Sequence, residues 1–341
     1  MNYIEPTVEL YMEKDPLLKL ERCIRVAYKS ESKIKEGSAE KLIKAILSHH
    51  HTSTLEHYRI RVLCDSTIRD NVSIWQEKRG RAFIQIKAGD DEYDSVLIGN
   101  LRAFLDLIYS ADCDFDTRWI IQDLLYTEFP KIFNEVVIYP ANFESLDFDS
   151  VKYDGEDTEY ATFHVVTNRA VLGEITRHRT LSPTVESTRY CDYQSNGISI
   201  CTPYPYNWSP EPNENFQVWV DNLIFDWADN HPEYVTADGI ITHAGMYELA
   251  RLAKIQGIFE SAMKNAELSY NALKDLGERP QSARCTLPMA LKSEMYLTGT
   301  FEAWNHFIKL RTAPDADPQI QYIAKMIAEY INQLRFSHQE E

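Results

Sequence analysis

The sequence of 341 residues lacks long hydrophobic runs. It contains no stretch of about 18 consecutive apolar residues, which is roughly the length that a membrane-spanning helix needs. The first residues, Met1–Pro6, have neither the basic nor the apolar region of a signal peptide. We therefore expect a soluble protein of the cytoplasm, or of the host cytoplasm if the source is viral, with no membrane partner.

Paired cysteines are also lacking. The six cysteines include no C-x-x-C pair and follow no regular spacing, so the sequence indicates neither a zinc ribbon nor a disulfide framework. Reduced thiols are expected. Cys191 lies close to the basic segment described below, but its neighbours supply no base that would activate a thiolate, and a packing role is favoured.

Positive charge is scarce, because 35 lysines and arginines stand against 52 aspartates and glutamates and give a formal net charge of -17. Proteins that bind nucleic acids usually present an extended basic surface, so this composition argues against a nucleic-acid partner. A small anionic ligand remains possible where a few cations gather in a cleft.

One segment concentrates the scarce cations. Residues 177–190 contain three arginines, one histidine and two serines. Apolar residues are interleaved with these charges, which favours partial burial over a solvated basic face, and buried guanidinium groups need partners. Phosphates and carboxylates suit them, because an arginine can bind either at two points.

The surrounding pattern predicts a mixture of helices and strands. Helical spacing is expected from Ser38, as the capping residue, to Leu47, and again over 101–109 and 168–177. Strands are expected over 58–64 and 161–166, so that His51–His57 lies in a helix-to-strand connection. Beyond Thr180 an irregular chain is expected, because Pro183 has no backbone N–H. The acidic run 154–157 is expected to be a solvated loop.

The C-terminal half is predicted to be mainly helical. A long helix over 244–276, stopped by Gly277, carries a Met and aromatic stripe that is expected to pack in the core. A final helix begins at Pro318 with Asp317 as its cap. With strands expected before these helices, the fold class is α+β.

Three ordered segments give the chain a specific resemblance. Arg177-His178-Arg179, seven further residues and Ser187 form the signature of the flavin-dependent thymidylate synthases. His51–His57 resembles the upstream His-x-Ser/Thr-x-x-Glu-His stretch of that family. Ala283–Pro288 and His306–Arg311 match it near the C-terminus. The resemblance covers about residues 43–60, 164–206 and 280–332.

The resemblance implies a reaction and an architecture. The reaction is reductive methylation of dUMP to dTMP, with 5,10-methylenetetrahydrofolate as the carbon donor, FAD as the flavin cofactor and NADPH as the hydride source. The architecture is a central antiparallel sheet with mixed helices in one elaborated catalytic domain over 1–341, although the length alone would permit two domains. Residues 65–160 are expected to be an insertion after the first strand, and a homotetramer with shared active sites is implied.

The same resemblance implies site residues. Those matched to FAD binding are His51, Ser53, Glu56, Arg177, His178, Arg179, Thr300, Glu302 and His306. Those matched to dUMP binding are Glu174, Arg177, Glu186, Ser187, Thr188, Arg189, Arg284 and Arg311. Arg311 is the expected catalytic residue, because a fixed cation against the uracil would stabilise negative charge that develops on the ring. The alternative for Arg311 is an ordinary ion pair at a helix end.

The chain also departs from the family pattern. Thr184, Val185, Thr300 and Glu302 stand where many relatives carry other residues, and Ala316-Asp317-Pro318-Gln319 replaces the usual Ala-Gln-x-Glu. These departures leave open a nucleotide- or flavin-binding module without turnover.

A third hypothesis, a metal-dependent hydrolase, would use His49, His50, His51 and His57 with Glu56. Adjacent side chains diverge on helices and strands, so this hypothesis is the least favoured and no metal is expected.

Overall fold

The computed structural model describes residues 1–79, 84–89, 93–133, 146–195, 197–201 and 227–337. One four-stranded sheet lies at its centre, with the strand order β2-β7-β10-β8 and every neighbouring pair antiparallel. Its strands are β2 (Thr7–Leu10), β7 (Tyr160–Asn168), β8 (Ser182–Val185) and β10 (Lys292–Thr300). We call it the signature sheet, because β8 lies inside the arginine-rich segment.

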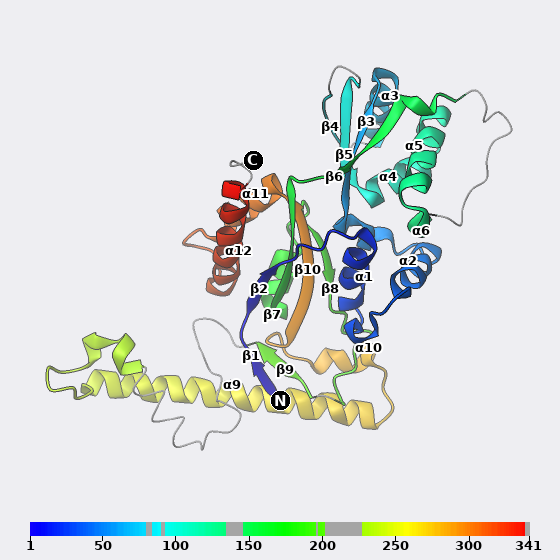
Figure 1. Cartoon of the computed structure of the whole chain (residues 1–341). Helices are drawn as coiled ribbons and strands as arrows, with labels where there is room; N and C mark the ends of the chain where they lie inside the picture. The colour runs from blue at the N-terminus through cyan, green and yellow to red at the C-terminus, as the bar shows by residue number, and fades with distance from the viewer. Residues whose placement is uncertain (80–83, 90–92, 134–145, 196, 202–226, 338–341) are drawn as a thin grey trace.

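Helices cover both faces of the signature sheet. Figure 1 shows α11 and α12 on one side and α1 on the other. Phe163 and Leu297 pack with Trp304, Phe307 and Ile323 in a fully buried cluster. The helices that accompany this sheet are α1 (Pro16–Val26), α7 (Arg169–Ile175), α11 (Phe301–Arg311) and α12 (Pro318–Ser337).

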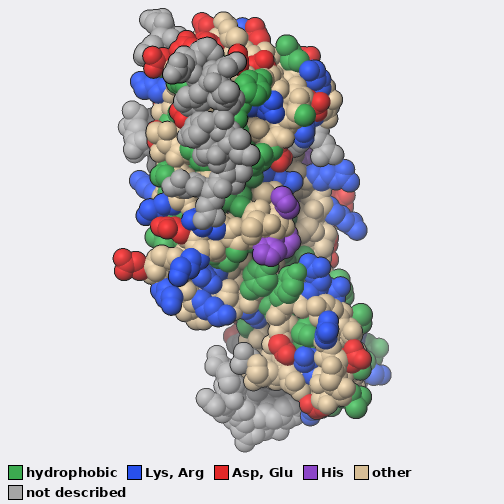
Figure 2. Space-filling model, turned by 90° about the vertical axis from the view of Figure 1, so that its right-hand side faces the viewer, with side chains coloured by type: hydrophobic (Ala, Val, Ile, Leu, Met, Phe, Trp, Pro, Cys, Tyr) green, Lys and Arg blue, Asp and Glu red, His purple; other side chains and the backbone are tan. Residues whose placement is uncertain are grey.

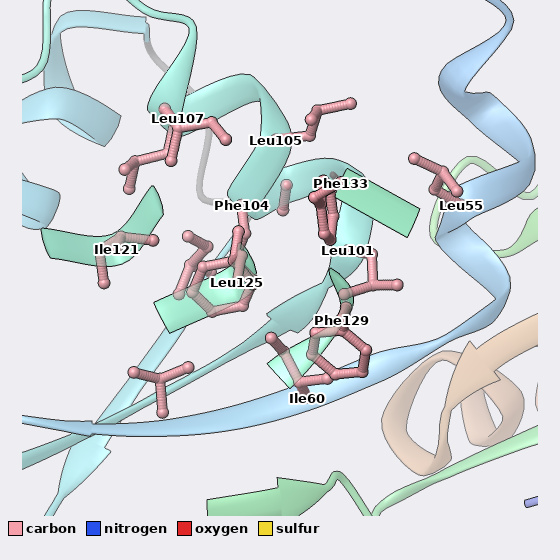
Figure 3. Close-up of a cluster of buried hydrophobic side chains, with 14 of the residues drawn as sticks. Leu55, Ile60, Leu101, Phe104, Leu105, Leu107, Ile121, Leu125, Phe129 and Phe133 are labelled. Atoms are coloured by element: carbon pink, nitrogen blue, oxygen red, sulfur yellow. The ribbon is translucent and has the colours of Figure 1, made fainter. Parts of the chain in front are cut away.

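A second antiparallel sheet is formed by β3 and by three strands from the predicted insertion over 65–160. Its order is β4-β5-β3-β6, and its strands are β3 (Arg59–Cys64), β4 (Gln85–Ala88), β5 (Ser95–Asn100) and β6 (Val151–Glu156). The helices packed with it are α3 (Ser66–Arg79), α4 (Leu101–Ile108), α5 (Phe115–Glu128) and α6 (Pro130–Phe133). Figure 3 shows its core, where Phe104, Leu125 and Phe129 gather with Ile60. We call it the apolar sheet.

The remaining elements connect and extend these sheets. The helical ones are α2 (Ser38–Ser48), α9 (His243–Asp275), α10 (Pro280–Ala283), η1 (Glu31–Lys33), η2 (Thr52–His57), η4 (Phe148–Ser150), η5 (Pro232–Tyr234) and η6 (Arg284–Thr286). The strand β1 (Asn2–Ile4) pairs in parallel with β9 (Ser199–Cys201). Among the residues that the structure describes, no helix is long and apolar enough to cross a membrane.

The predicted mixture of helices and antiparallel strands is confirmed. The helices at 38–48, 101–108 and 169–175 and the strands at 59–64 and 160–168 match the sequence patterns. Asp317 accepts hydrogen bonds from the first turn of α12, and Gly277 ends α9 with a φ of 87°. The cap of α2 was predicted wrongly, since Gly37 holds that position and Ser38 Oγ donates to Glu21 instead.

The prediction of an irregular chain after Thr180 is wrong for 182–185, which forms β8. Pro183 lies opposite Leu297 of β10 and is tolerated because β8 is the edge strand of the signature sheet. An edge strand bonds on one side only, so the missing N–H of a proline can face outward. The arginine-rich segment is therefore anchored to the sheet by its middle.

Three further predictions are corrected. β1 and β2 precede the strand that was expected to be the first, and β10 makes a central strand in the C-terminal half. The acidic run 154–157 is not a solvated loop, because Asp157 is buried against Arg59 at 2.7 Å and Asp154 pairs with Arg61. These carboxylates are paired because Arg59 and Arg61, which are alternate residues of β3, supply guanidinium groups to them.

Only part of the apolar stripe of α9 lies in the core of this chain. Met246 is 59% exposed and Ile258 is 63% exposed, whereas Met263 and Tyr270 near the other end are buried. Figure 1 shows the reason, because the first part of α9 extends beyond the signature sheet. Helical periodicity identifies an apolar face, but it does not identify what covers that face.

Candidate active site

The upstream histidine segment and the arginine-rich segment meet at His57. This ring is wholly buried between η2 and the signature sheet. Its Nε2 lies 2.7 Å from Thr184 Oγ1 on β8, and its Nδ1 lies 2.7 Å from Thr298 Oγ1 on β10. Burial, with a smaller contribution from the Lys19 charge, lowers the pKa of His57 to about 3. The ring is therefore neutral and joins two segments that are 127 residues apart.

A cavity of about 320 Å³ lies where these segments meet. Residues from α1, the His51–Thr54 segment and the Pro183–Tyr190 segment form its walls. Four of the predicted site residues line it, namely His51, Ser53, Ser187 and Arg189. Figure 2 shows histidine side chains together on the face seen from the side of α2, next to a small hydrophobic patch and to lysine or arginine side chains.

A second group of predicted residues gathers at the C-terminal end of α11. Arg311 Nη1 donates to Glu174 Oε2 at 2.7 Å, and Arg311 Nε donates to His178 Nε2 at 2.8 Å. The His178 ring lies 6.4 Å from that of His306 and packs on Phe307. Residues 174, 178, 306 and 311 thus converge, and the helix-end ion pair considered for Arg311 is present.

The charge state of His178 follows from these contacts. Burial comes first, and the Arg311 and His306 charges then add to it, so the pKa of His178 is lowered. A neutral ring is what the geometry requires, because its Nε2 accepts the hydrogen bond from Arg311. An anionic ligand placed against this group would favour the protonated ring.

The turn that connects the two groups is held close to the sheet. Leu181 is buried and packs closely on Gly299. A Cβ atom at position 299 would lie only 2.3 Å from Leu181 Cδ2, so a larger residue does not fit there. Arg177 and Arg179 precede this contact, and both are exposed. The guanidinium groups of the signature therefore remain accessible to a ligand while the chain beside them is anchored.

Glu186 differs from the other residues matched to dUMP, because its carboxylate is buried. Tyr193 donates to Oε1 at 2.6 Å, Lys29 Nζ lies 3.0 Å from the same oxygen, and Lys292 Nζ lies 3.4 Å from Oε2. Both oxygens are thus engaged with protein groups. Neighbouring Thr188 is also buried. Through these buried contacts, Glu186 anchors the arginine-rich segment to the rest of the fold.

The other predicted residues lie at the edges of the site. Glu56 forms an ion pair with Arg102 of α4. Thr300 caps α11 by accepting from the backbone N–H of Ala303 at 3.2 Å, and Glu302 is exposed in the first turn of that helix. Arg284 is exposed on η6, which packs against α9 rather than against β8.

Three residues near the site carry no sequence motif. Tyr28 lines the cavity, and its ring lies 4.9 Å from that of Tyr190. Lys29 has a positive φ of 47° and forms an ion pair with Glu186. Arg102, on helix α4 beside the apolar sheet, forms an ion pair with Glu56. Only tertiary contact identifies them. Cys191 is buried, which raises the pKa of its thiol to about 11, in agreement with the packing role.

The histidines do not form a metal centre. In the described part of the chain no three His, Cys, Asp or Glu side chains are grouped in a way that could hold a metal ion. Both nitrogens of His57 face threonine hydroxyls, and His50 has a left-handed backbone with a φ of 56°. The arrangement therefore gives no support to the hydrolase hypothesis.

Comparisons with known proteins agree with the motifs. The family model described as thymidylate synthase complementing protein matches residues 157–334. A probable flavin-dependent thymidylate synthase of Mycobacterium phage L5 is 27% identical over 179 residues, covering 51% of this chain and 58% of that protein. The corresponding protein of Mycobacterium phage D29 is 29% identical over 175 residues, covering 51% and 60%.

Two further similarities complete the comparison. The flavin-dependent thymidylate synthase of Halobacterium salinarum is 23% identical over 175 residues, covering 49% of this chain and 60% of that protein. A crystal structure of the UMP/dUMP methylase PolB from Streptomyces cacaoi bound with 5-Br UMP aligns with a TM-score of 0.39 and 16% identity, covering 98% and 92%. The chain spans somewhat over half the length of the curated relatives it matches. The family model covers more than half of the chain and includes the arginine-rich signature, so this protein belongs to the thymidylate synthase complementing protein family.

Proposed function

We propose that this protein catalyses the reductive methylation of dUMP to dTMP, with 5,10-methylenetetrahydrofolate as the carbon donor and FAD and NADPH as the hydride source. The observation that carries the proposal is the cavity in which His51 and Ser53 face Ser187 and Arg189, in a chain of this family. Segments far apart in sequence supply its walls, as a site for two ligands requires.

The cavity suits a mononucleotide in size and charge. Its volume of about 320 Å³ is near the lower end of the roughly 300–1,000 Å³ typical of ligand pockets. Arg189 provides a cation for the phosphate, and hydroxyl and imidazole groups provide hydrogen bonds for the sugar and base. In a chain with a net charge of -17, these local cations would attract an anion to this cleft.

The exposed donor set also fits FAD. Arg177 and Arg179 belong to the same arginine-rich segment as the cavity residues Ser187 and Arg189 and are exposed, which matches the needs of a pyrophosphate. FAD is larger than the cavity, so it would extend from the wall that contains His51 and Ser53 toward these arginines, with His178 and His306 as further proposed contacts. Bound FAD would carry the hydride that NADPH supplies. Glu56, Thr300 and Glu302 are proposed only as peripheral contacts.

Arg311 would act as the activating residue. Glu174 and His178 orient its guanidinium group, so the charge is held in a fixed position. A uracil ring placed against this cation would be stabilised when negative charge develops on it. Arg284 would reach the nucleotide phosphate only through the α9 side of the site, and in a homotetramer a neighbouring subunit could supply it.

The assembly and organisation are proposed as follows. Met246, Tyr247 and Ile258 expose a large apolar area on α9, which a second copy of the chain would cover in a homotetramer. The whole chain would be one catalytic domain. Residues 65–160 would be an insertion whose strands pair with β3 to form the apolar sheet. The cytoplasm is the proposed location.

A combined spectral and product assay tests the function. Purified protein should show the absorbance of bound oxidised flavin, and it should form dTMP from dUMP when methylenetetrahydrofolate and NADPH are present. Omission of NADPH from the same mixture is the control and should stop turnover. Flavin binding without dTMP would favour the module without turnover, and a colourless protein that takes up no added FAD would overturn the proposal.

A further inference from the structure

We infer that His57 is a positioning residue whose buried imidazole holds the η2 wall of the cavity against the β8 wall. The inference rests on the proposed function, because it concerns the same cavity. It assigns His57 a role that is neither metal ligation nor contact with a substrate. Its basis is a chain of hydrogen bonds that crosses from one sheet unit to the other.

The chain of hydrogen bonds contains one histidine and three threonines. His57 Nε2 lies 2.7 Å from Thr184 Oγ1, and His57 Nδ1 lies 2.7 Å from Thr298 Oγ1. Thr162 Oγ1 in turn lies 2.8 Å from Thr298 Oγ1. All four residues are buried. A neutral imidazole donates from one nitrogen and accepts at the other, and hydroxyls can do either, so every group can be satisfied in one direction of the chain.

The location of His57 connects the two cavity walls. It is the last residue of η2, and His51, Ser53 and Thr54 of the cavity wall precede it by a turn or two. Its partner Thr184 lines the opposite wall between Pro183 and Val185. β8 pairs with a strand at one edge only, and η2 and α1 both contact it, so the two bonds of His57 fix η2 to the face formed by β8 and β10.

Directional bonds matter here more than apolar contact does. Leu55 of η2 is also buried, but an apolar contact fixes separation without fixing direction. Binding groups on two separate segments need to keep their geometry within roughly 0.5 Å to act together. The two hydrogen bonds of His57 supply that constraint, and the absence of charge on the ring avoids a buried cation without a counter-ion.

A matched pair of threonine variants isolates this role. Thr298→Val and Thr162→Val both lose the bond between these two hydroxyls, but only Thr298→Val also loses the bond to His57. Neither residue lines the cavity, so neither substitution removes a direct ligand contact. His57→Leu removes both bonds to the ring.

Two measurements are made on the full-length protein. The first is the dissociation constant for dUMP, and the second is the hydrogen exchange of amides in residues 52–57 and 182–187 without ligand. Thr298→Val and His57→Leu should weaken dUMP binding about tenfold, as loss of a buried hydrogen bond predicts, and should speed exchange in both segments. Thr162→Val should stay within about twofold of the wild type in binding.

Equal effects of Thr298→Val and Thr162→Val on exchange and on binding would overturn the inference, because general loss of packing would then explain both. If the wild type does not bind dUMP at all, the proposed function fails. The exchange comparison still decides the role of His57 in that case, since it needs no ligand. Retained exchange protection in His57→Leu would overturn that role even in a protein that binds dUMP normally.

Discussion

The two antiparallel sheets of this protein use their arginines in opposite ways. In the apolar sheet, Arg59 pairs with Asp157 and Arg61 pairs with Asp154, each at 2.7 Å, beside a core of aliphatic and aromatic side chains (Figure 3). Next to the signature sheet, Arg177 and Arg179 are exposed, and Arg189 lines the cavity. The arginines of the apolar sheet are neutralised by carboxylates of the same chain, whereas the arginines next to the signature sheet remain accessible to a ligand.

This difference shows when an arginine cluster indicates a binding site. Both sheets carry arginines near one another in sequence, yet those of β3 face carboxylates on the neighbouring strand. The arginines of the signature precede an edge strand, where a neighbouring strand is present on one side only. A ligand can therefore supply the negative charge that a second neighbouring strand would otherwise supply.

The largest expected effect concerns Arg311. Arg311→Ala should reduce dTMP formation by about 10³-fold or more, because the preorganised cation that would stabilise charge on the substrate is lost. The folded structure should persist, since the guanidinium group is at the end of α11. Lys309→Ala removes an exposed cation from the same last turn and is the control, with normal turnover expected. Normal turnover in Arg311→Ala would refute the catalytic assignment.

A pair of leucine truncations tests the separation of the two sheets. Leu97 of β5 and Leu297 of β10 are both fully buried, so replacement of either by Ala should cost about 3 kcal/mol of unfolding free energy. Only Leu297→Ala should also weaken dUMP binding, because Leu297 lies opposite Pro183 in the cavity wall. Denaturant unfolding and ligand titration check the two parts. Equal loss of dUMP binding in both variants would mean that the sheets do not act separately.

The pH dependence of stability should report on the joint between the sheets. The pKa of His57 is lowered to about 3 in the folded chain, from the ordinary value of 6.5, by burial and by Lys19 of α1. Above pH 6.5 the ring is neutral in both states and no stability is lost. As pH falls below that value the unfolded chain takes up the proton first, and stability should fall by up to about 1.4 kcal/mol per pH unit.

His57→Gln is the comparison for this measurement. Glutamine has no proton to take up in this range, so the difference in unfolding free energy between the two proteins should shrink as the pH is lowered from 6.5 to 4.5. Unfolding curves in urea at several pH values provide the data. Parallel pH profiles for the two proteins would show that His57 is not held neutral by the fold.

The smallest effect is expected at the surface of the apolar sheet. Arg61→Ala breaks a half-exposed ion pair with Asp154 and should cost less than about 1 kcal/mol. Arg59→Ala leaves the Asp157 carboxylate buried without its partner and should cost several times more. Thermal unfolding compares the two. Turnover per folded molecule should be unchanged in Arg61→Ala, and a changed value would contradict the view that these arginines are only structural.

Local patterns predicted the elements well where one residue type determines the outcome. Asp317 and Pro318 mark the start of α12, and Gly277 marks the end of α9, because capping and left-handed backbone depend on the residue itself. The prediction at Pro183 is wrong, because the effect of a proline depends on whether the strand is at an edge of the sheet. The prediction at Met246 is also wrong, because an apolar helix face does not identify the surface that covers it.

The candidate site was predicted in part. The motifs located His51, Ser53, Ser187 and Arg189, which do share one cavity. They gave no indication that Glu186 would be buried between Lys29 and Lys292, or that Tyr28 would lie beside Tyr190. Contacts of this kind join residues more than a hundred positions apart, and no local pattern encodes which of them meet.

The sequence by itself determined the family, the scarcity of positive charge and the place where that charge gathers, since these depend on residue identity and order. The tertiary structure alone decided that the cavity exists and that His57 joins its walls. It also decided that the arginines of β3 are neutralised while those of the signature are not. The physical reason is that charge pairing and burial depend on distance in space, which the chain sets only when both sheets have formed.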